Sequence, residues 1–470
     1  MKVLFAVAEA YPFAKVGGLA DVGGALPKAL ARRGHEVRLV LPRYPALAAG
    51  KRVRSLRLPL GDRSARVDVR HGGSFGGVEL YTVGNRTYFG REQIYGYDDD
   101  HVRFILFSKA VAAIAARFAW TPDVIHVHDW HTALVPQLLR EGSFWKTLDG
   151  TATVLTLHNL AYQGPLDPEA EALLGLNGSF RGNLLSRGIA FADAVNTVSQ
   201  TYLEEILTPA NGMGLHGLLR SRRASVRGIL NGVDYDEFDP ASDPYLAAQY
   251  DASSFDGRRR NKLALQEQVG LPLDPEVPLL GLVCRLVDQK GLDLLCASLD
   301  ELAEMGLQVV VVGDGEERYR AAVARAVLRY PAAIAHPADT GEGIARMVYA
   351  GSDLFLAPSI YEPCGLAPLI ALRYGSIPVV RRTGGLAETI RDYTRDQRNG
   401  FGFTFVPKYP RDLVATVKIA LAVYREPERW RRLQRRAMGA DFSWGRSVRE
   451  YERMYREAQA TRVTRLAASG

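Results

Sequence analysis

Short runs rich in Val, Ile and Leu alternate with longer amphipathic segments along most of this chain. Such alternation is typical of βαβ units, in which parallel strands are joined by helices. It starts at residues 2–8, KVLFAVA, and breaks at residues 234–256, a stretch rich in Asp, Pro and Ser. It then resumes at residues 278–286, PLLGLVCRL. The pattern therefore predicts an α/β protein with two doubly wound domains.

Each predicted domain has its own set of strands. In the first domain we expect strands at residues 2–8, 35–42, 77–83, 123–128, 151–158, 193–199 and 226–232. In the second we expect them at residues 278–286, 307–315, 332–337, 353–359, 377–382 and 400–405. In doubly wound sheets ligands bind beyond the carboxyl ends of the strands, so the default site is a cleft between the two domains.

The domain boundaries follow from the break in the pattern. We expect an N-terminal domain at residues 1–237, a linker at 238–256, a C-terminal domain at 257–445 and a final helix at 446–470. The final helix is rich in Arg. Two alternatives remain open for it: a solvated surface helix, or a segment that returns to the N-terminal domain.

Composition narrows the class of protein. A chain of 470 residues exceeds what one hydrophobic core usually serves, which agrees with two domains. The net charge of +7 is spread along the chain and suits either nucleic acid or a phosphorylated metabolite. The three cysteines lack metal-ligand or disulfide spacing, and the first apolar run is too short for a signal peptide. No window approaches the roughly 18 apolar residues of a membrane span, so we expect a cytoplasmic protein.

The first predicted strand is followed by a glycine-rich loop that suits a phosphate. Its sequence, KVGGL at residues 15–19, matches neither G-x-G-x-x-G nor the Walker pattern. However, Gly17 and Gly18 let a ligand approach the backbone, and the helix that follows offers N–H groups. Lys15 adds a positive charge. The alternative is a tight strand–helix turn with a solvated lysine, and this loop alone does not decide between the two.

Further strand–helix junctions of this kind lie in the second half of the chain. CRLVDQKG places Arg285 and Lys290 after a strand, where two cations suit a pyrophosphate. Glu362 lies just ahead of a helix that opens at residues 364–365, where its carboxylate can accept hydrogen bonds from sugar hydroxyls. TGG at residues 383–385 repeats the strand–glycine–helix arrangement. Each junction alone could be a surface turn, but together they favour an anionic ligand.

A series of short motifs occurs in an order that resembles bacterial glycogen synthases and plant starch synthases. These motifs are KVGGLADV, HDWH, HNLAYQG, GILNGVD, RLVDQKG, EPCGL and RRTGGLAE, and they span essentially the whole chain. The resemblance implies a retaining glycosyltransferase of type B architecture, with two Rossmann-like domains facing a deep inter-domain cleft. It implies ADP-glucose as the donor substrate, an α-1,4-glucan such as glycogen as the acceptor, no cofactor, and neither nucleic acid nor membrane as a partner.

The resemblance also implies roles for the matching residues. On the donor side it implies Lys15, Gly17, Gly18, His158, Asn159, Asn231, Arg285, Lys290, Glu362, Cys364, Gly365, Leu366, Thr383, Gly384 and Gly385. On the acceptor side it implies Tyr95, Asp129, Trp130 and His131. The residues predicted to act in the reaction itself are Asp129, His158, Arg285, Lys290 and Glu362.

The reaction path follows from the carboxylates. Retention by double displacement needs two carboxylates about 5–5.5 Å apart, and Glu362 is the one carboxylate with a strong placement beside the sugar. We therefore favour same-face attack, in which the acceptor hydroxyl enters beside the departing phosphate and the phosphate takes the proton. The resemblance places the backbone carbonyl of His158 near the developing positive charge. Asp129 is the second candidate for a base or an electrostatic stabiliser.

The segment HVHDWH, residues 126–131, could suggest a metal site. His126 and His128 alternate with Val127, so both project from one face of a strand, and a role in core packing is an equal alternative. No further ligand cluster is evident in the sequence, so we predict no metal. Protein cations are then expected to offset the diphosphate of the donor.

One departure from the family pattern bears on donor affinity. After EPCGL the family has a hydroxyl residue or Gly and then Gln, whereas this chain has Ala367 and Pro368. Proline is tolerated in the first turn of a helix, but it removes one potential phosphate donor. Cys364 begins the same helix near the predicted cations, so we expect a reactive thiol there, and we expect Cys284 and Cys296 to be buried and inert.

Two other functions are compatible with these motifs. One is a retaining glycosyltransferase of the same fold that acts on a lipid or a small sugar. The other is a regulator that binds a nucleotide sugar without turnover, although such a protein would be expected to have lost at least one predicted site residue. A dinucleotide oxidoreductase is disfavoured because G-x-G-x-x-G is absent.

Overall fold

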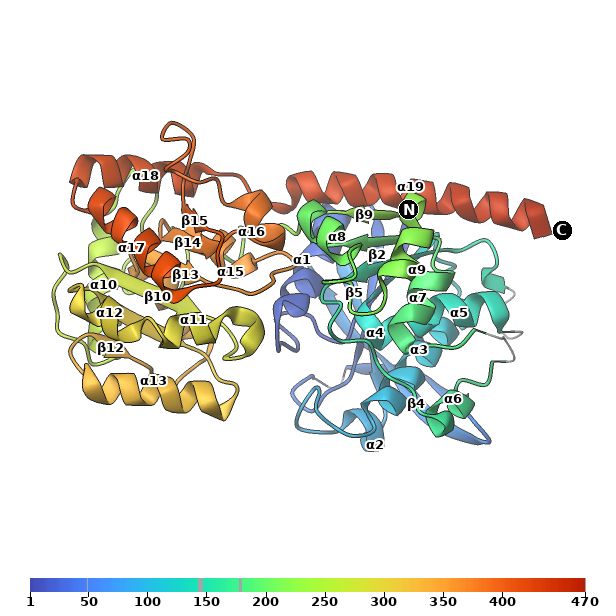
Figure 1. Ribbon diagram of the computed structural model, residues 1–470. Coiled ribbons are helices and arrows are strands. Elements are labelled where there is room, and N and C mark those ends of the chain that lie inside the picture. The colour runs from blue at the N-terminus through green and yellow to red at the C-terminus, as the bar shows by residue number, and fades with distance from the viewer. Residues whose placement is uncertain (49, 143–146, 177–179, 470) are drawn as a thin grey trace. The chain divides into compact units, whose positions relative to one another are not determined.

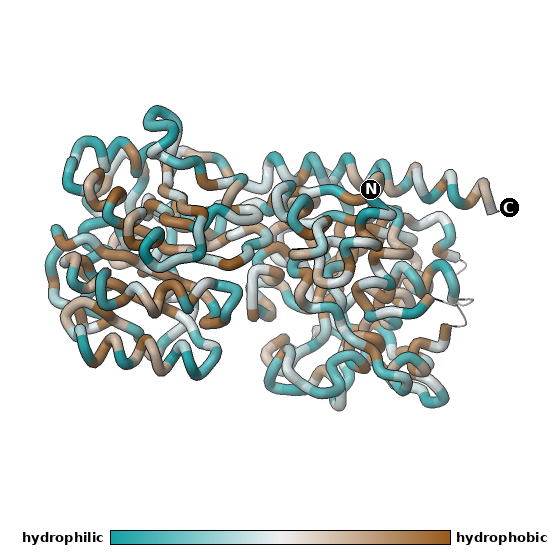
Figure 2. The backbone as a smooth tube through the Cα atoms, in the orientation of Figure 1, coloured by the Kyte–Doolittle hydropathy of each residue, from teal (hydrophilic) through white to brown (hydrophobic). Residues whose placement is uncertain are grey.

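The computed structural model describes residues 1–48, 50–142, 147–176 and 180–469 and divides the chain into two compact units (Figure 1). Unit 1 comprises Met1–Gly232 and Trp444–Gly470, and unit 2 comprises Val233–Ser443. Each unit is built on a mainly parallel sheet with its own hydrophobic core. Figure 2 shows hydrophobic segments gathered in the strands inside each unit. The predicted fold class, two doubly wound α/β domains, is confirmed.

Unit 1 contains a nine-stranded sheet in the order β3-β4-β5-β2-β1-β6-β7-β8-β9. Its strands are β1 (Lys2–Ala6), β2 (Glu36–Pro42), β3 (Lys51–Leu60), β4 (Arg63–Phe75), β5 (Val78–Gly84), β6 (Val124–His128), β7 (Ala152–Leu157), β8 (Ala194–Thr197) and β9 (Val226–Gly228). From β5 to β9 all neighbouring strands are parallel. The chain order reverses between β1 and β6, so the connections after these two strands diverge and leave a crevice at their carboxyl ends.

Helices join most of these strands. They are α1 (Gly18–Arg32), α2 (Arg86–Phe89), α3 (Asp100–Arg117), α4 (Asp129–Thr132), α5 (Leu134–Glu141), α6 (Pro168–Leu173), α7 (Leu184–Phe191), α8 (Gln200–Ile206), α9 (His216–Ser221) and the short 3-10 helix η2 (Arg223–Ser225). Their starts follow ordinary capping chemistry. Asn85, Asp167, Asn183 and Ser199, for example, each accept a hydrogen bond from a backbone N–H in the first turn of the helix that follows.

An antiparallel hairpin, β3–β4, extends the sheet at one edge, where the sequence analysis predicted no strands. β3 alternates buried and exposed residues only from Leu56 to Leu60, and its first half is exposed and rich in Lys and Arg. A charged edge strand lacks the apolar pattern by which strands are recognised. The same charges hinder pairing with another chain, which is the usual protection of a sheet edge.

The final helix, α19 (Trp444–Ser469), belongs to unit 1 and runs along it in red in Figure 1. It packs on α1, β7 and β8. Trp444, Tyr451 and Tyr455 lie on its buried side, at helical spacing, within the core of unit 1. A two-pronged ion pair joins Arg33 at the end of α1 to Glu452 on α19, with N–O distances of 2.6 and 2.9 Å. Of the two alternatives left open for this helix, the structure shows the segment that returns to the N-terminal unit.

Unit 2 contains a six-stranded, entirely parallel sheet in the order β12-β11-β10-β13-β14-β15. Its strands are β10 (Leu279–Val283), β11 (Gln308–Val312), β12 (Ile334–Ala335), β13 (Leu354–Ala357), β14 (Ile377–Arg381) and β15 (Phe403–Phe405). All of them lie within the predicted strand ranges. The chain order reverses between β10 and β13, which places a second crevice at the carboxyl ends of those strands.

The helices of unit 2 alternate with its strands. They are α10 (Asp256–Gln268), the 3-10 helix η3 (Asp288–Lys290), α11 (Leu292–Cys296), α12 (Leu299–Glu304), α13 (Glu317–Arg329), α14 (Glu342–Gly351), α15 (Leu366–Arg373), α16 (Gly384–Thr389), α17 (Pro410–Tyr424) and α18 (Pro427–Gly439). Pro368 is the third residue of α15, within the first turn. No helix in the described ranges of either unit is long and apolar enough to cross a lipid bilayer.

Residues 238–256, predicted as a linker, are instead an integral part of unit 2, which begins at Val233 and ends at Ser443. Tyr250 is buried and donates its hydroxyl hydrogen to the carbonyl of Tyr374 at 2.7 Å. Asp243 is buried as well, with Oδ2 3.1 Å from Nη1 of the buried Arg346. The Asp- and Pro-rich composition indicated irregular structure, but it did not reveal that the side chains of this segment fill the core of unit 2.

Candidate active site

The loop after β1 carries the first predicted site residues. It leads into α1 at the point where the strand order of unit 1 reverses. The buried Glu9 accepts hydrogen bonds from the backbone N–H groups of Val16 (2.5 Å) and Gly17 (3.0 Å). The N–H of Gly17, a residue predicted on the donor side, is therefore directed at a carboxylate of the protein itself.

Lys15 lies on the same loop and is partly exposed. Its Nζ is 2.9 Å from Oδ1 of Asp21, in the first turn of α1, and 5.2 Å from the ring centroid of Tyr11. Gly18 is the first residue of α1. Further along, Gly24 is required by close packing, because a Cβ there would lie 2.2 Å from the carbonyl oxygen of Tyr11. Gly24 thus lets α1 pack tightly against the loop that bears Lys15.

Glu9 is the residue of this loop that the sequence analysis missed. Burial raises the pKa of Glu9 to about 7, although hydrogen bonds from the backbone and from Tyr95 oppose the rise. The Tyr95 hydroxyl donates to Oε1 of Glu9 at 3.0 Å. The available signal was a lone carboxylate directly after an apolar strand, at the sheet edge where ligands bind.

Tyr95 lies between α2 and α3, in a segment held by a buried arginine. Arg103 donates from Nε to the carbonyl of Tyr88 (2.6 Å) and from Nη1 to the carbonyl of Ile94 (3.0 Å). The ring of Tyr95 stacks on that of His131, with centroids 4.8 Å apart. Two elements distant in sequence therefore present these predicted acceptor residues together.

His131 and Trp130 come from α4, directly after β6. Their ring centroids are 4.4 Å apart, and Phe104 of α3 lies edge-on to both, at 5.0 Å from Trp130 and 4.7 Å from His131. Burial lowers the pKa of His131 to about 3, so this ring is neutral at physiological pH. A rigid, neutral aromatic group of this kind suits the faces of sugar rings.

Asp129 is the turning point between β6 and α4. Its φ of 51° lies in the left-handed region, which is unusual for a residue other than glycine and costs about 1–3 kcal/mol. This conformation directs Oδ1 at the backbone N–H of His158, 2.7 Å away. Burial raises the pKa of Asp129 to about 7, against the effect of the N–H groups of His158 and Asn159. Asp129 thus holds the start of the loop after β7 in place.

The other predicted residues of unit 1 lie at the ends of β7 and β9. His158 is partly exposed, and its Nε2 lies 2.9 Å from Nδ1 of the buried His128. Oδ1 of Asn159 accepts the N–H of Ala161 at 3.1 Å. Asn231 is buried, and its Oδ1 has no hydrogen-bond partner among the described residues. An unpaired buried amide oxygen is uncommon in proteins and marks a position suited to a ligand donor.

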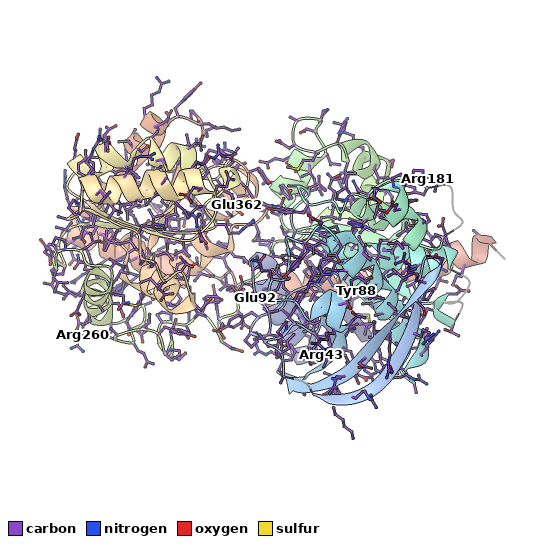
Figure 3. All side chains as sticks on the ribbon, turned by 90° about the horizontal axis from the view of Figure 1, so that it is seen from below. Arg43, Tyr88, Glu92, Arg181, Arg260 and Glu362 are labelled. Carbon is purple, nitrogen blue, oxygen red and sulfur yellow. The ribbon has the colours of Figure 1, made fainter. Side chains whose placement is uncertain are left out.

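Unit 2 brings its predicted cation and carboxylate into direct contact. Glu362, labelled in Figure 3, lies on the loop after β13. It forms an ion pair with Lys290, on η3 after β10, with Nζ 2.6 Å from Oε2. Ser359 donates its hydroxyl hydrogen to the same oxygen at 2.9 Å. Both groups lie at the reversal point of the sheet. Arg285 is exposed on the loop that leads from β10 to η3.

The loop that carries Glu362 is fixed by contacts from two neighbouring elements. Arg381, at the end of β14, donates from Nε to the carbonyl of Ser359 at 2.7 Å and contacts the carbonyl of Ile360. The N–H of Gly385, in α16, donates to the carbonyl of Glu362 at 2.9 Å. Arg381 and Ser359 were not predicted, because a buried arginine and a serine before "IYEP" have no distinctive sequence signal.

The remaining predicted residues of unit 2 form the starts of α15 and α16. Gly365 caps α15 with a φ of 85°, a conformation that favours glycine. Thr383 caps α16, and Leu366 and Gly384 are the first residues of the two helices. Both helix starts thus lie beside the loop of Glu362.

The three cysteines are thiols that form no disulfide, and they lie in different surroundings. Burial raises the pKa of Cys284 to about 12, and burial also raises the pKa of Cys296. Contrary to expectation, Cys284 and Cys296 are only partly buried, whereas Cys364, just before α15, is buried. Across the described ranges, no group of three or more His, Cys, Asp or Glu side chains is arranged to hold a metal ion.

Comparison with known proteins assigns the family. Residues 2–221 match the family "Starch synthase catalytic domain", and residues 266–437 match "Glycosyl transferases group 1". The chain is 44% identical to a glycogen synthase of Moorella thermoacetica, with 97% of each chain covered. It is 43% identical to a glycogen synthase of Geobacillus stearothermophilus, with 97% of this chain and 98% of that one covered.

Solved structures agree with this result. The catalytic domain of starch synthase IV from Arabidopsis thaliana, bound to ADP and acarbose, matches with a TM-score of 0.91 and 34% identity, over 98% of this chain and 99% of that chain. Sucrose-phosphate synthase from Thermosynechococcus elongatus matches with a TM-score of 0.64 over 98% of this chain and 99% of that chain. At 18% identity, this match shows the shared fold alone. The resemblance read from the motifs is thereby confirmed: the chain belongs to the family of glycogen synthases and starch synthases and is a retaining glucosyltransferase of type B fold.

Proposed function

We propose that this enzyme transfers glucose from ADP-glucose to the non-reducing end of an α-1,4-glucan, with retention of configuration. The observation that carries the proposal is the contact between Lys290 and Glu362 at the reversal point of the unit 2 sheet. This pair offers a cation for phosphate and a carboxylate for sugar hydroxyls within one site. The curated relatives named glycogen synthase, and the starch synthase solved with ADP and acarbose, support the choice of substrates.

In the proposed donor complex, Lys290 and Arg285 bind the diphosphate. Negative charge on the leaving ADP grows in the transition state, so fixed cations at that position lower the barrier. Glu362 accepts hydrogen bonds from the sugar hydroxyls, held in position by Ser359. The proposal includes no cofactor, because the protein cations supply the charge that the diphosphate requires.

The proposed reaction takes place on one face of the sugar. The bond between the anomeric carbon and the β-phosphate oxygen breaks, and the 4-hydroxyl oxygen of the acceptor forms the new bond from the same side. The hydroxyl proton passes to the departing phosphate, which leaves ADP and a glucan longer by one glucose. Positive charge that develops on the sugar is stabilised by the backbone carbonyl of His158.

Unit 1 positions His158 and binds the acceptor in this proposal. Asp129 accepts the N–H of His158, so its role is to place the loop that carries this carbonyl. Tyr95, Trp130 and His131 provide the aromatic surface against which glucose rings of the acceptor stack. We place the enzyme in the cytoplasm, where cysteine thiols that form no disulfide stay reduced.

The test is glucose incorporation into glycogen from ADP-glucose and from UDP-glucose. We expect much faster incorporation from ADP-glucose, and an α-1,4-specific amylase should release the newly added glucose. Lys290→Ala and Arg285→Ala should each lower turnover about a hundredfold to a thousandfold. Lys418→Ala is the matched control, because Lys418 forms an exposed ion pair with Glu301 elsewhere in unit 2. Equal use of both donors, or near-normal turnover of the Lys290 variant, would contradict the proposal.

A further inference from the structure

Three histidine rings lie in series beneath the unit 1 site. His126 and His128, on β6, have ring centroids 4.2 Å apart. His128 then reaches the loop after β7, where its Nδ1 lies 2.9 Å from Nε2 of His158. The centroids of these last two rings are 5.2 Å apart and their planes differ by 29°, which suits an N–H···N hydrogen bond between the ring edges. The series leads from the core of the sheet to a predicted site residue.

All three rings are neutral. Burial lowers the pKa of His126 and His128 well below the usual range and lowers that of His158 to about 3. A neutral imidazole carries one N–H and one bare nitrogen, and the partners of the ring decide which nitrogen has the proton. The hydrogen bond between His128 and His158 therefore has two alternative directions.

The surroundings of His128 select one direction. Its Nε2 is buried and has no hydrogen-bond partner among the described residues. The ring centroids of His128 and Phe5 are 4.3 Å apart. If Nε2 carried the proton, a buried N–H would be left unpaired. If Nδ1 carries it, only a bare nitrogen is left unpaired, and orphaned N–H groups are the rarer of the two in proteins. The proton of His128 thus belongs on Nδ1, and His128 is the donor.

His126 is already committed to other partners. Its Nδ1 pairs with the hydroxyl of Tyr455 on α19 at 2.7 Å, and its Nε2 pairs with the hydroxyl of Thr156 at 2.7 Å. It therefore packs against His128 without exchanging a hydrogen bond with it. This makes His126 a natural control, since it is equally buried and adjacent but lies outside the bond to His158.

We propose that His128 is a positioning residue that fixes the tautomer of His158. By donating its Nδ1–H to Nε2 of His158, it leaves the single proton of His158 on Nδ1. That nitrogen has no hydrogen-bond partner among the described residues, so it offers a donor to a ligand. The role of this N–H toward a ligand rests on the proposed function, in which His158 lies at the sugar. There the fixed N–H can donate a hydrogen bond to a sugar hydroxyl oxygen.

The tautomers can be read directly in the full-length protein without substrate. Isotope-labelled histidine and long-range proton–nitrogen correlation spectra distinguish Nδ1–H from Nε2–H rings, and His158→Gln and His128→Asn identify the signals. We expect both His128 and His158 as Nδ1–H. In His128→Phe the ring of His158 should shift toward the Nε2–H form that free histidine prefers. In His128→Asn, whose side-chain amide can donate from nearly the same place, it should remain Nδ1–H, and His126→Phe should leave it unchanged.

Kinetics test the consequence for the reaction. His128→Phe should lower kcat/KM for ADP-glucose about tenfold, mainly by raising KM, and His128→Asn should recover most of this loss. Thermal unfolding of each variant shows that the unit remains folded. An Nε2–H ring at His158 in the unmodified protein, or an unchanged tautomer in His128→Phe, would overturn the proposal whatever the substrate. Wild-type kinetics in His128→Phe despite a changed tautomer would overturn the positioning role and leave the proposed function standing.

Discussion

Replacing Glu9 by Gln should change how the stability of unit 1 depends on pH. In the folded protein burial raises the pKa of Glu9 from the usual 4.5 to about 7. Between these values the unfolded chain has released the proton and the folded chain still holds it. The free energy of unfolding therefore falls as pH rises through this window and is level above and below it. Gln does not titrate, so the variant lacks this fall.

The magnitude follows from the two pKa values. One pKa unit is worth about 1.36 kcal/mol, so the complete effect is about 3 kcal/mol, of which about 2.5 kcal/mol falls between pH 5 and pH 8. The charge of Glu9 also raises the pKa of Asp129. Removing Glu9 therefore lowers the pKa of Asp129, which further reduces the fall in the free energy of unfolding as pH rises. Gln keeps an oxygen for the N–H groups of Val16 and Gly17, so the loop should keep its geometry. Relative to the unmodified protein, Glu9→Gln should thus gain about 2.5 kcal/mol from pH 5 to pH 8.

The assay is urea unfolding at a series of pH values, followed by hydrogen exchange in peptides of unit 1 so that unfolding of unit 2 does not contribute. Glu92→Gln, which replaces an exposed carboxylate between α2 and α3, is the control and should follow the unmodified protein. If the difference between Glu9→Gln and the unmodified protein is the same at pH 5 and pH 8, Glu9 is not held protonated by burial and the reasoning is refuted.

Three further predictions concern other parts of the chain. Glu452→Gln should destabilise unit 1 at pH 7 by about 1–2 kcal/mol, because the hydrogen bond from Arg33 lowers the pKa of Glu452 to about 2. The difference in stability between the variant and the unmodified protein should vanish as pH falls from about 4.5 toward 2, which acid titration of unfolding would show. Arg346→Ala should destabilise unit 2 by about 3–5 kcal/mol, because it leaves the buried Asp243 without its cation. The unfolding of unit 1 should not change, and unchanged protease resistance of unit 2 would contradict this prediction. A thiol reagent should inactivate the enzyme through Cys364, with protection by ADP-glucose and resistance in Cys364→Ser; peptide mapping that finds the label mainly on Cys284 or Cys296 would contradict it.

The sequence by itself determined the architecture and the family. Parallel strands buried on both faces, such as β11 and β13, are nearly continuous apolar runs, so their positions can be read locally. The order of strands and helices predicts doubly wound units, and motifs such as KVGGL and EPCGL, which are specific to the family, identify it. The residues that these motifs contain follow strand ends, where chain topology places binding sites.

Only the tertiary structure decided which residues support those motifs. Glu9 accepts the N–H groups of its own loop, Arg381 holds the carbonyls beside Glu362, and His128 contacts His158 from another strand. The contacts of Arg381 and His128 join segments that become neighbours only when the chain has folded, and the contact of Glu9 depends on how its loop folds back, so no local pattern announces them. The hairpin β3–β4 and the segment at 238–256 were missed for a related reason. Charge and proline content describe a segment in isolation, whereas its place at a sheet edge or in a core depends on what packs against it.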